Sequence, residues 1–171
     1  MMAQASSTAA TKAKPAASRD AGYSGTPLAT KLGLKDEQEV VFIDLPASLS
    51  ELAQARSFAR VSLLEEAADS RLPRGSVDLM HAFFTDAAAL RDALPSLRAA
   101  IRDTGAIWIS WPKKTAKGKA AQPSSDLSDE VVRRAALAIN LVDVKVCAVD
   151  AVWSGLKLVI SRAERAPKHT S

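Results

Sequence analysis

The sequence predicts an α/β domain built on a mostly parallel sheet that ends in an antiparallel hairpin. Short apolar runs, typical of buried strands, alternate along the chain with segments of helical periodicity, and this alternation favours parallel strands joined by helical crossovers. The last two runs, 141–150 and 156–161, are only about six residues apart. A crossover between parallel strands needs about a dozen residues or more, so these two strands must be antiparallel.

The first elements follow from local signals near the start of the ordered chain. Thr26 can cap a short helix, Pro27 suits its first position, and Gly33 can supply a left-handed stop. The next run, Val40–Leu45, is too uniformly apolar for a half-exposed strand, which predicts a central one. A short helix is expected over Ser48–Arg56.

The middle of the chain predicts one weaker strand and two strong ones, at 58–66, 77–85 and 106–111. A helix with its leucines on one stripe should fill 87–103, capped by Thr85 or Asp86. Pro95 should kink or divide this helix, and Thr104-Gly105 should end it.

The last third begins with the helix 129–140, capped by Ser125 or Ser128. In the strand 141–150 the apolar residues alternate, which places Val142, Val144, Val146 and Ala148 on one face and Cys147 on the other. A parallel sheet with a reversed last strand resembles the class I methyltransferase-like Rossmann fold. The predicted fold class is therefore a single three-layer Rossmann-like domain.

Composition supports one domain with tails. The chain has 171 residues, 47% of them hydrophobic, and a single cysteine, so no internal disulfide can form. We expect an Ala/Ser/Lys-rich disordered arm over 1–22, which also faintly resembles an organelle transit peptide, then a domain over 23–161 and a flexible basic tail over 162–171. No apolar run is long enough to span a bilayer.

The positive charge lies outside the predicted domain body. The net charge is +4, yet the arm, the Lys-rich loop 112–123 and the tail together carry +8, which leaves −4 for the rest. A dedicated nucleic-acid domain would carry its basic residues on a structured face. Nucleic-acid binding is therefore expected to be weak.

The residues after the first strand argue against a cofactor. Methyltransferases of this fold need glycines there, because the backbone must approach S-adenosylmethionine closely. This chain has Leu45-Pro46-Ala47-Ser48 instead. We also identify no acid at the end of a clear second strand to hold the ribose hydroxyls. The sequence therefore predicts no cofactor.

Three runs carry a resemblance to a family: "GYSGTPLATKLG" at 22–33, "WPKK" at 111–114 and "LVDVKVCAVDAVWSGLK" at 141–157. They resemble a family of small uncharacterised bacterial proteins known as a domain of unknown function. The resemblance spans about residues 22–161 and implies a bacterial cytosolic protein with a compact methyltransferase-like fold. It implies no activity. The long arm and the stretch Lys117–Ala121 depart from the family pattern.

Candidate ligand-binding residues follow the predicted strands, because ligands of open α/β sheets bind outside the carboxyl ends of the strands. They are Asp44, Thr85, Trp111, Lys113, Lys114 and Trp153. The lysines would bind a phosphate or carboxylate, or form a solvated basic loop; the tryptophans would stack on a planar ligand or pack at the sheet end. Asp44 would accept a ligand hydroxyl, or cap a helix or pair with a lysine. Tyr23 and Ser24 would contact a ligand or fix the chain entry.

No catalytic constellation appears in the sequence. His81 lies inside a buried strand, as a core histidine would, and Cys147 lies mid-strand without a neighbour to ionise it. Two histidines and one cysteine cannot supply a standard zinc site. No nucleophile elbow, phosphate loop or carboxylate pair is present. We assign no catalytic and no metal residue.

The sequence thus favours a non-enzymatic, methyltransferase-like binding or interaction module. Its partner is expected to be an anionic small molecule or a protein, held at the carboxyl edge of the sheet, with no membrane association. Two alternatives stay open at this point: a divergent methyltransferase or other transferase, and a protein weakly associated with nucleic acid. The oligomeric state is left open.

Overall fold

The structure is a computed structural model that describes residues 27–67, 71–114 and 125–165. The chain forms two compact units, Met1–Gly33 and Leu34–Ser171. In the first unit the described residues form the short helix α1 (Leu28–Lys31), which is followed by Gly33 at a φ of 80°. That left-handed glycine confirms the predicted helix stop. Thr26, the predicted cap, lies outside the described residues.

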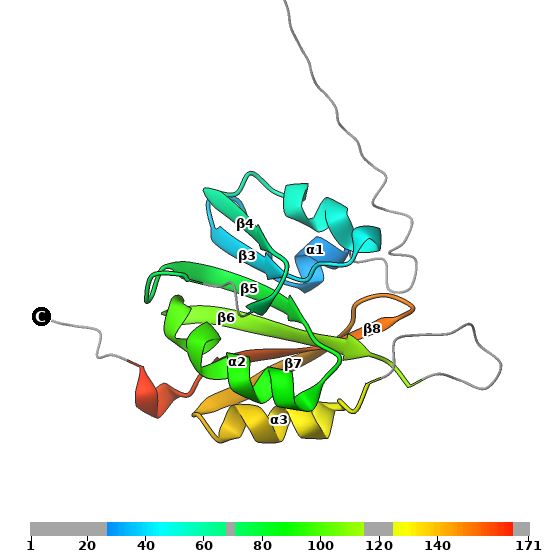
Figure 1. The fold of residues 1–171 in the computed structure, drawn as a ribbon. Coiled ribbons are helices and arrows are strands. Elements are labelled where there is room, and N and C mark those ends of the chain that lie inside the picture. Colours follow the sequence, from blue (N-terminus) through cyan, green and yellow to red (C-terminus); the bar gives the residue numbers. More distant parts are fainter. Residues whose placement is uncertain (1–26, 68–70, 115–124, 166–171) are drawn as a thin grey trace, which may run out of the picture. The chain divides into compact units, whose positions relative to one another are not determined.

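The second unit contains a six-stranded sheet with the order β4-β3-β5-β6-β8-β7 among the described residues (Figure 1). The strands are β3 (Glu39–Ile43), β4 (Arg60–Leu64), β5 (Val77–Phe83), β6 (Ile101–Pro112), β7 (Leu141–Ala148) and β8 (Trp153–Ile160). The first four in this order are parallel, whereas β8 runs antiparallel to both β6 and β7. The predicted fold class is confirmed: a Rossmann-like α/β domain whose sheet ends in an antiparallel hairpin.

Within the described part of the chain, four helices accompany this sheet: η2 (Ala47–Gln54) and η4 (Arg162–Glu164), both of the 3-10 type, and α2 (Ala87–Ala100) and α3 (Asp129–Leu137). Asp86 caps α2 by accepting a hydrogen bond from the Ala89 N–H at 2.7 Å, and Ser128 caps α3 through the Val131 N–H at 3.2 Å. Pro95 lies inside α2 without dividing it.

The main core lies between the sheet and the helices α2 and α3, which Figure 1 shows side by side against the strands. Leu90, Leu94 and Leu97 of α2 are almost fully buried, as their stripe predicts. The same cluster includes Val41 of β3 and Ile160 of β8. One core therefore joins residues that are far apart in the sequence.

The strand β6 begins earlier than the sequence predicts. It starts at Ile101 directly after α2, so Thr104-Gly105 is not the helix stop that we expect from the sequence. Gly105 lies within β6, where a Cβ atom would come within 2.9 Å of the Asp78 carbonyl oxygen and 3.0 Å of that of Val77. The glycine lets β5 and β6 approach each other at a register shift.

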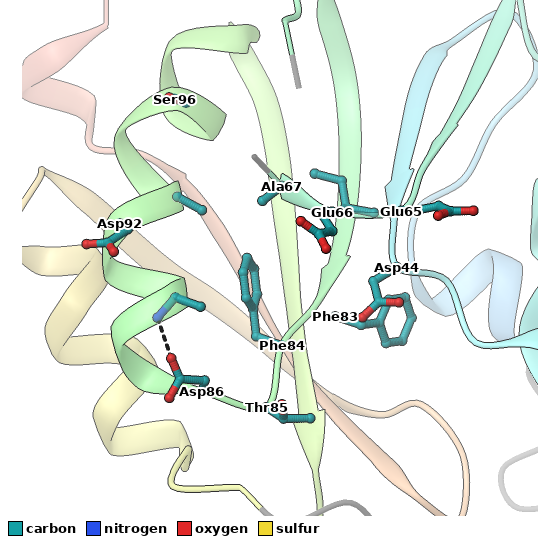
Figure 2. A pocket seen from close by; sticks show the side chains of 13 residues that line it. Asp44, Glu65, Glu66, Ala67, Phe83, Phe84, Thr85, Asp86, Asp92 and Ser96 are labelled. Atoms are coloured by element: carbon teal, nitrogen blue, oxygen red, sulfur yellow. Dashed lines mark hydrogen bonds between the residues drawn. The ribbon is translucent and has the colours of Figure 1, made fainter. Parts of the chain in front are cut away.

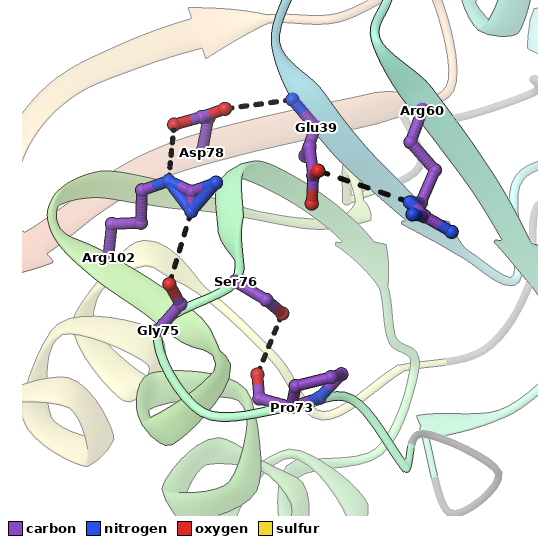
Figure 3. Close-up of polar contacts among 7 residues, drawn as sticks. All are labelled: Glu39, Arg60, Pro73, Gly75, Ser76, Asp78 and Arg102. Carbon is purple, nitrogen blue, oxygen red and sulfur yellow. Dashed lines mark hydrogen bonds and ion pairs between the residues drawn. The ribbon is translucent and has the colours of Figure 1, made fainter.

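Polar contacts join three strands at their amino ends (Figure 3). The Asp78 carboxylate accepts the Glu39 N–H at 2.8 Å and pairs with Arg102 Nε at 3.1 Å. Arg102 also donates to the Gly75 carbonyl at 3.1 Å. One half-buried carboxylate thus connects β3, β5 and the start of β6. By contrast, the Arg60–Glu39 pair is 4.0 Å apart, and the Arg60 side chain is exposed.

The strand β7 does not have the face that its alternating sequence predicts. The register with β8 shifts between Asp143 and Lys145, so Val144 is the extra residue of a bulge. Val144 and Val146 are 55% and 60% exposed rather than on a common buried face. Cys147 is buried, as expected. None of the described helices is long and apolar enough to cross a membrane.

Candidate functional site

A cavity of about 460 Å³ opens at the carboxyl ends of three neighbouring parallel strands (Figure 2). The end of β3 contributes Ile43 and Asp44, the segment after β4 contributes Glu65–Ala67, and the end of β5 contributes Phe83–Asp86. The helix α2 closes one side with Ala89, Asp92, Ala93 and Ser96. Its size and its place in the sheet are those of a ligand site in an open α/β fold.

Asp44 explains how the chain turns after β3 without a glycine. It adopts a left-handed φ of 57°, a conformation that aspartate tolerates better than most residues with a Cβ. Its N–H still donates to the Leu64 carbonyl at 2.7 Å. The turn then passes through Pro46 into η2. A non-glycine residue therefore provides the backbone conformation that glycine commonly supplies at such a turn.

The expectation that no acid closes the second strand is wrong. The strand β4 ends at Leu64, and Glu65 and Glu66 follow it directly into the cavity lining. The strand lies at the sheet edge and is largely exposed, so its sequence lacks the uniform apolar run that marks β3. Desolvation, and then the charge of Glu65, raise the pKa of the Asp44 carboxyl, which places these two acids close together.

The cavity is strongly acidic and its charges are not balanced. Asp86 is engaged as the α2 cap, whereas the other four acids form no hydrogen bond or ion pair through their side chains with any residue that the structure describes. They are Asp44, Glu65, Glu66 and Asp92. Lysine and arginine are absent from the described lining. Such a site favours a positively charged ligand or one rich in hydroxyl donors.

Within 27–67, 71–114 and 125–165, no group of three or more histidine, cysteine or acidic side chains is arranged to hold a metal ion. The five acids of the described cavity lining come from the end of β3, the segment after β4, the end of β5 and the helix α2. An extended ligand fits this arrangement better than a single cation.

Aromatic residues form the apolar wall. Phe83 and Phe84 line the cavity from the end of β5 (Figure 2). Phe83 stacks on His81 with ring centroids 4.3 Å apart and meets Trp153 edge-on at 5.1 Å. Trp153, predicted as a ligand wall, thus contacts a wall residue without lining the cavity itself.

The other predicted site residues lie in different places. Thr85 lines the cavity together with Asp44. Trp111 is buried in the main core, Lys113 is partly buried with its N–H donating to the Val152 carbonyl, and Lys114 is exposed. These three residues do not line the cavity. Tyr23, Ser24 and most of the Lys-rich loop lie outside the described residues.

His81 has the surroundings of a core histidine. It is fully buried, and its Nε2 lies 2.7 Å from the Ser110 hydroxyl. Burial lowers the pKa of the imidazole to about 3, so it is neutral at physiological pH. Its contact with Phe83 makes it a support of the cavity wall.

No family model matches this chain, and no curated protein matches it. Several solved structures match it in fold. A SAM-dependent methyltransferase from Aquifex aeolicus matches with a TM-score of 0.62 at 16% identity, over 77% of this chain and 87% of that one. The [4+2]-cyclase SpnF matches with a TM-score of 0.56 at 9% identity, over 78% and 79%.

A third match is a phosphoethanolamine N-methyltransferase from Haemonchus contortus, in complex with phosphomonomethylethanolamine and S-adenosylhomocysteine. Its TM-score is 0.52 at 10% identity, over 79% of this chain and 52% of that one. Likeness at such low identity establishes the fold. The chain has a methyltransferase-like Rossmann fold, and because a cyclase shares it, the fold does not by itself define a reaction.

Proposed function

We propose that this protein is a divergent methyltransferase that binds S-adenosylmethionine in the acidic cavity. The observation that carries the proposal is the set of unbalanced carboxylates at the ends of β3 and β4. S-adenosylmethionine carries a sulfonium and an ammonium against one carboxylate, so its net charge is positive. It also presents two ribose hydroxyls that can donate hydrogen bonds to carboxylates.

The residues of the cavity fit this ligand in chemistry and size. Glu65 follows the second strand along the chain, where an acid can accept the ribose hydroxyls, and Asp44 follows the first. Phe83 and Phe84 offer apolar surface for a flat base. The left-handed Asp44 provides the turn for which the sequence has no glycine. A bound S-adenosylmethionine would supply an electrophilic methyl group.

A second function uses the same cavity without methyl transfer. Pro46 lacks an N–H, and Leu45 and Ala47 bear Cβ atoms on the loop that borders the cofactor in this fold. These features favour a binding module that holds a cationic nucleoside without activating it. The predicted anion contacts at Lys113 and Lys114 would then serve a separate partner, and they stay a prediction.

Calorimetric titration with S-adenosylmethionine and with S-adenosylhomocysteine tests the proposal. The second compound has the same adenosyl group and lacks the sulfonium charge. We expect S-adenosylmethionine to bind at least fivefold more tightly, because the cavity carboxylates attract the extra positive charge. Glu65→Gln should weaken its binding about tenfold, whereas Glu51→Gln, an exposed acid on η2 outside the cavity lining, should change it less than twofold.

Failure of both compounds to bind at millimolar concentration would refute the assignment of the cavity. Tight binding with no transfer of a labelled methyl group to any protein, RNA or small-molecule acceptor in a cell extract would instead support the binding module. Equal affinity for the two compounds would show that the carboxylates do not interact with the sulfonium.

A further inference from the structure

A second charged site lies on the antiparallel half of the sheet, away from the cavity lining. The register of the hairpin places Lys145 of β7 directly opposite Lys157 of β8. Residues directly opposite across an antiparallel pair lie on the same face with their Cβ atoms about 5 Å apart, and like charges there destabilise the sheet. The hairpin thus holds two ammonium groups on one face.

A third lysine adds to this pair. Lys157 is partly buried, and its pKa is lowered first by burial, then by the charge of Lys145 and then by that of Lys35. Lys35 comes from the loop before β3 and is exposed, as is Lys145. Neither Lys35 nor Lys157 forms a side-chain ion pair with a residue in the part of the chain that the structure describes. The charge of Lys35 therefore acts on Lys157 together with that of Lys145.

We propose that Lys35, Lys145 and Lys157 form a binding site for a compact anion with several closely spaced charges, of the oligophosphate class. The lysines come from three separate segments, two strands and one loop, and they are not consecutive members of a solvated charge run. Ammonium groups on flexible stems act as point charges and suit phosphate oxygens. A multivalent anion would turn the repulsion among the three lysines into attraction.

This site is independent of the proposed function. None of the three lysines lines the acidic cavity, and the two sites attract ligands of opposite charge. The proposal also differs from the anion contact that the sequence suggests at Lys113 and Lys114, which follow β6.

Lys157→Met provides a test with two readouts, because methionine keeps much of the apolar stem and removes the charge. Without ligand, the melting temperature of this variant should rise above that of the wild type, since like-charge repulsion is relieved. At the same time, titration with sodium tripolyphosphate at constant ionic strength should give a dissociation constant at least tenfold weaker. Arg74→Met, which removes an exposed positive charge outside the cluster, should change neither quantity appreciably.

Two results would overturn the proposal. One is that wild-type protein does not bind tripolyphosphate at 1 mM (roughly the weak limit for a specific ligand). The other is that Arg74→Met weakens binding as much as Lys157→Met, which would indicate general attraction to a basic protein. If Lys157→Met does not fold, Lys145→Met at the exposed sheet edge replaces it with the same two expectations. Citrate in place of tripolyphosphate shows whether phosphate oxygens are preferred over carboxylates.

Discussion

At the scale of single residues, His81 is a fully buried imidazole whose pKa is lowered to about 3 by burial. The unfolded chain takes up a proton near pH 6.5, whereas the folded protein does not until about pH 3. The stability that depends on neutral His81 is therefore complete above pH 6.5 and is lost as the pH falls toward 3. Its slope is roughly 1.4 kcal/mol per pH unit.

His81→Gln isolates this contribution, because glutamine can still bond to the Ser110 hydroxyl and does not titrate. We expect the free energy of unfolding of the wild type, measured by urea denaturation between pH 6.5 and 4.5, to fall more steeply with decreasing pH than that of the variant. The difference in slope should correspond to the uptake of about one proton on unfolding. Parallel curves for the two proteins would mean that the imidazole is not held neutral.

At the scale of elements, one carboxylate joins three strands, and its removal should be costly. Asp78→Ala leaves the Glu39 N–H and Arg102 Nε without their acceptor. We expect a loss of about 1–3 kcal/mol in the free energy of unfolding, measured by chemical denaturation. Arg60→Ala is the matched control: its pair with Glu39 is long and exposed, so its loss should stay below about 0.5 kcal/mol. Equal losses would contradict the strand connection seen in Figure 3.

The elements also show what the sequence can and cannot predict. Buried strands such as β3 and β5 have uniform apolar runs, and the short link between β7 and β8 permits only a hairpin, so the fold class is predictable. The strand β4 lies at an exposed edge and its apolar pattern is weak, so the sequence places Glu65 and Glu66 inside the predicted strand 58–66 rather than after its end. A bulge such as that at Val144 changes which face a side chain occupies and leaves no mark in composition.

The candidate site was predictable only in part. Asp44 and Thr85 follow strong strands, so their meeting at one edge follows from parallel topology. Asp92 and Ser96 reach the cavity from the outer surface of α2, where an isolated sequence shows only ordinary polar residues. Lys145 and Lys157 face each other because of the register of two strands, which the bulge determines.

At the scale of the whole molecule, like charges gather in two places among the residues that the structure describes, acids at the cavity and lysines on the hairpin. The ion pairs Arg60–Glu39, Arg133–Asp129 and Arg134–Glu130 are largely exposed and contribute little. Salt shortens the screening length from about 10 Å at 0.1 M to about 3 Å at 1 M. The melting temperature should therefore rise as NaCl increases from 0.05 to 1 M, because screening weakens the repulsion within each cluster.

A variant with Glu65→Gln and Glu66→Gln should start from a higher melting temperature and rise less with salt. Scanning calorimetry of both proteins across the salt series gives the comparison. A fall in the wild-type melting temperature with added salt would show that attractive surface pairs outweigh the two clusters.

The core that runs from Val41 to Ile160 has a consequence for the newly made chain. The strands that form the cavity, β3, β4 and β5, leave the ribosome first, yet the side chains that cover them include those of α2, α3 and β8. The hairpin β7–β8, whose contacts are local, is made last and can pair fastest. During synthesis the apolar strands of the ligand site are therefore exposed to solvent until the later elements have been made. A chaperone would be needed most during that interval.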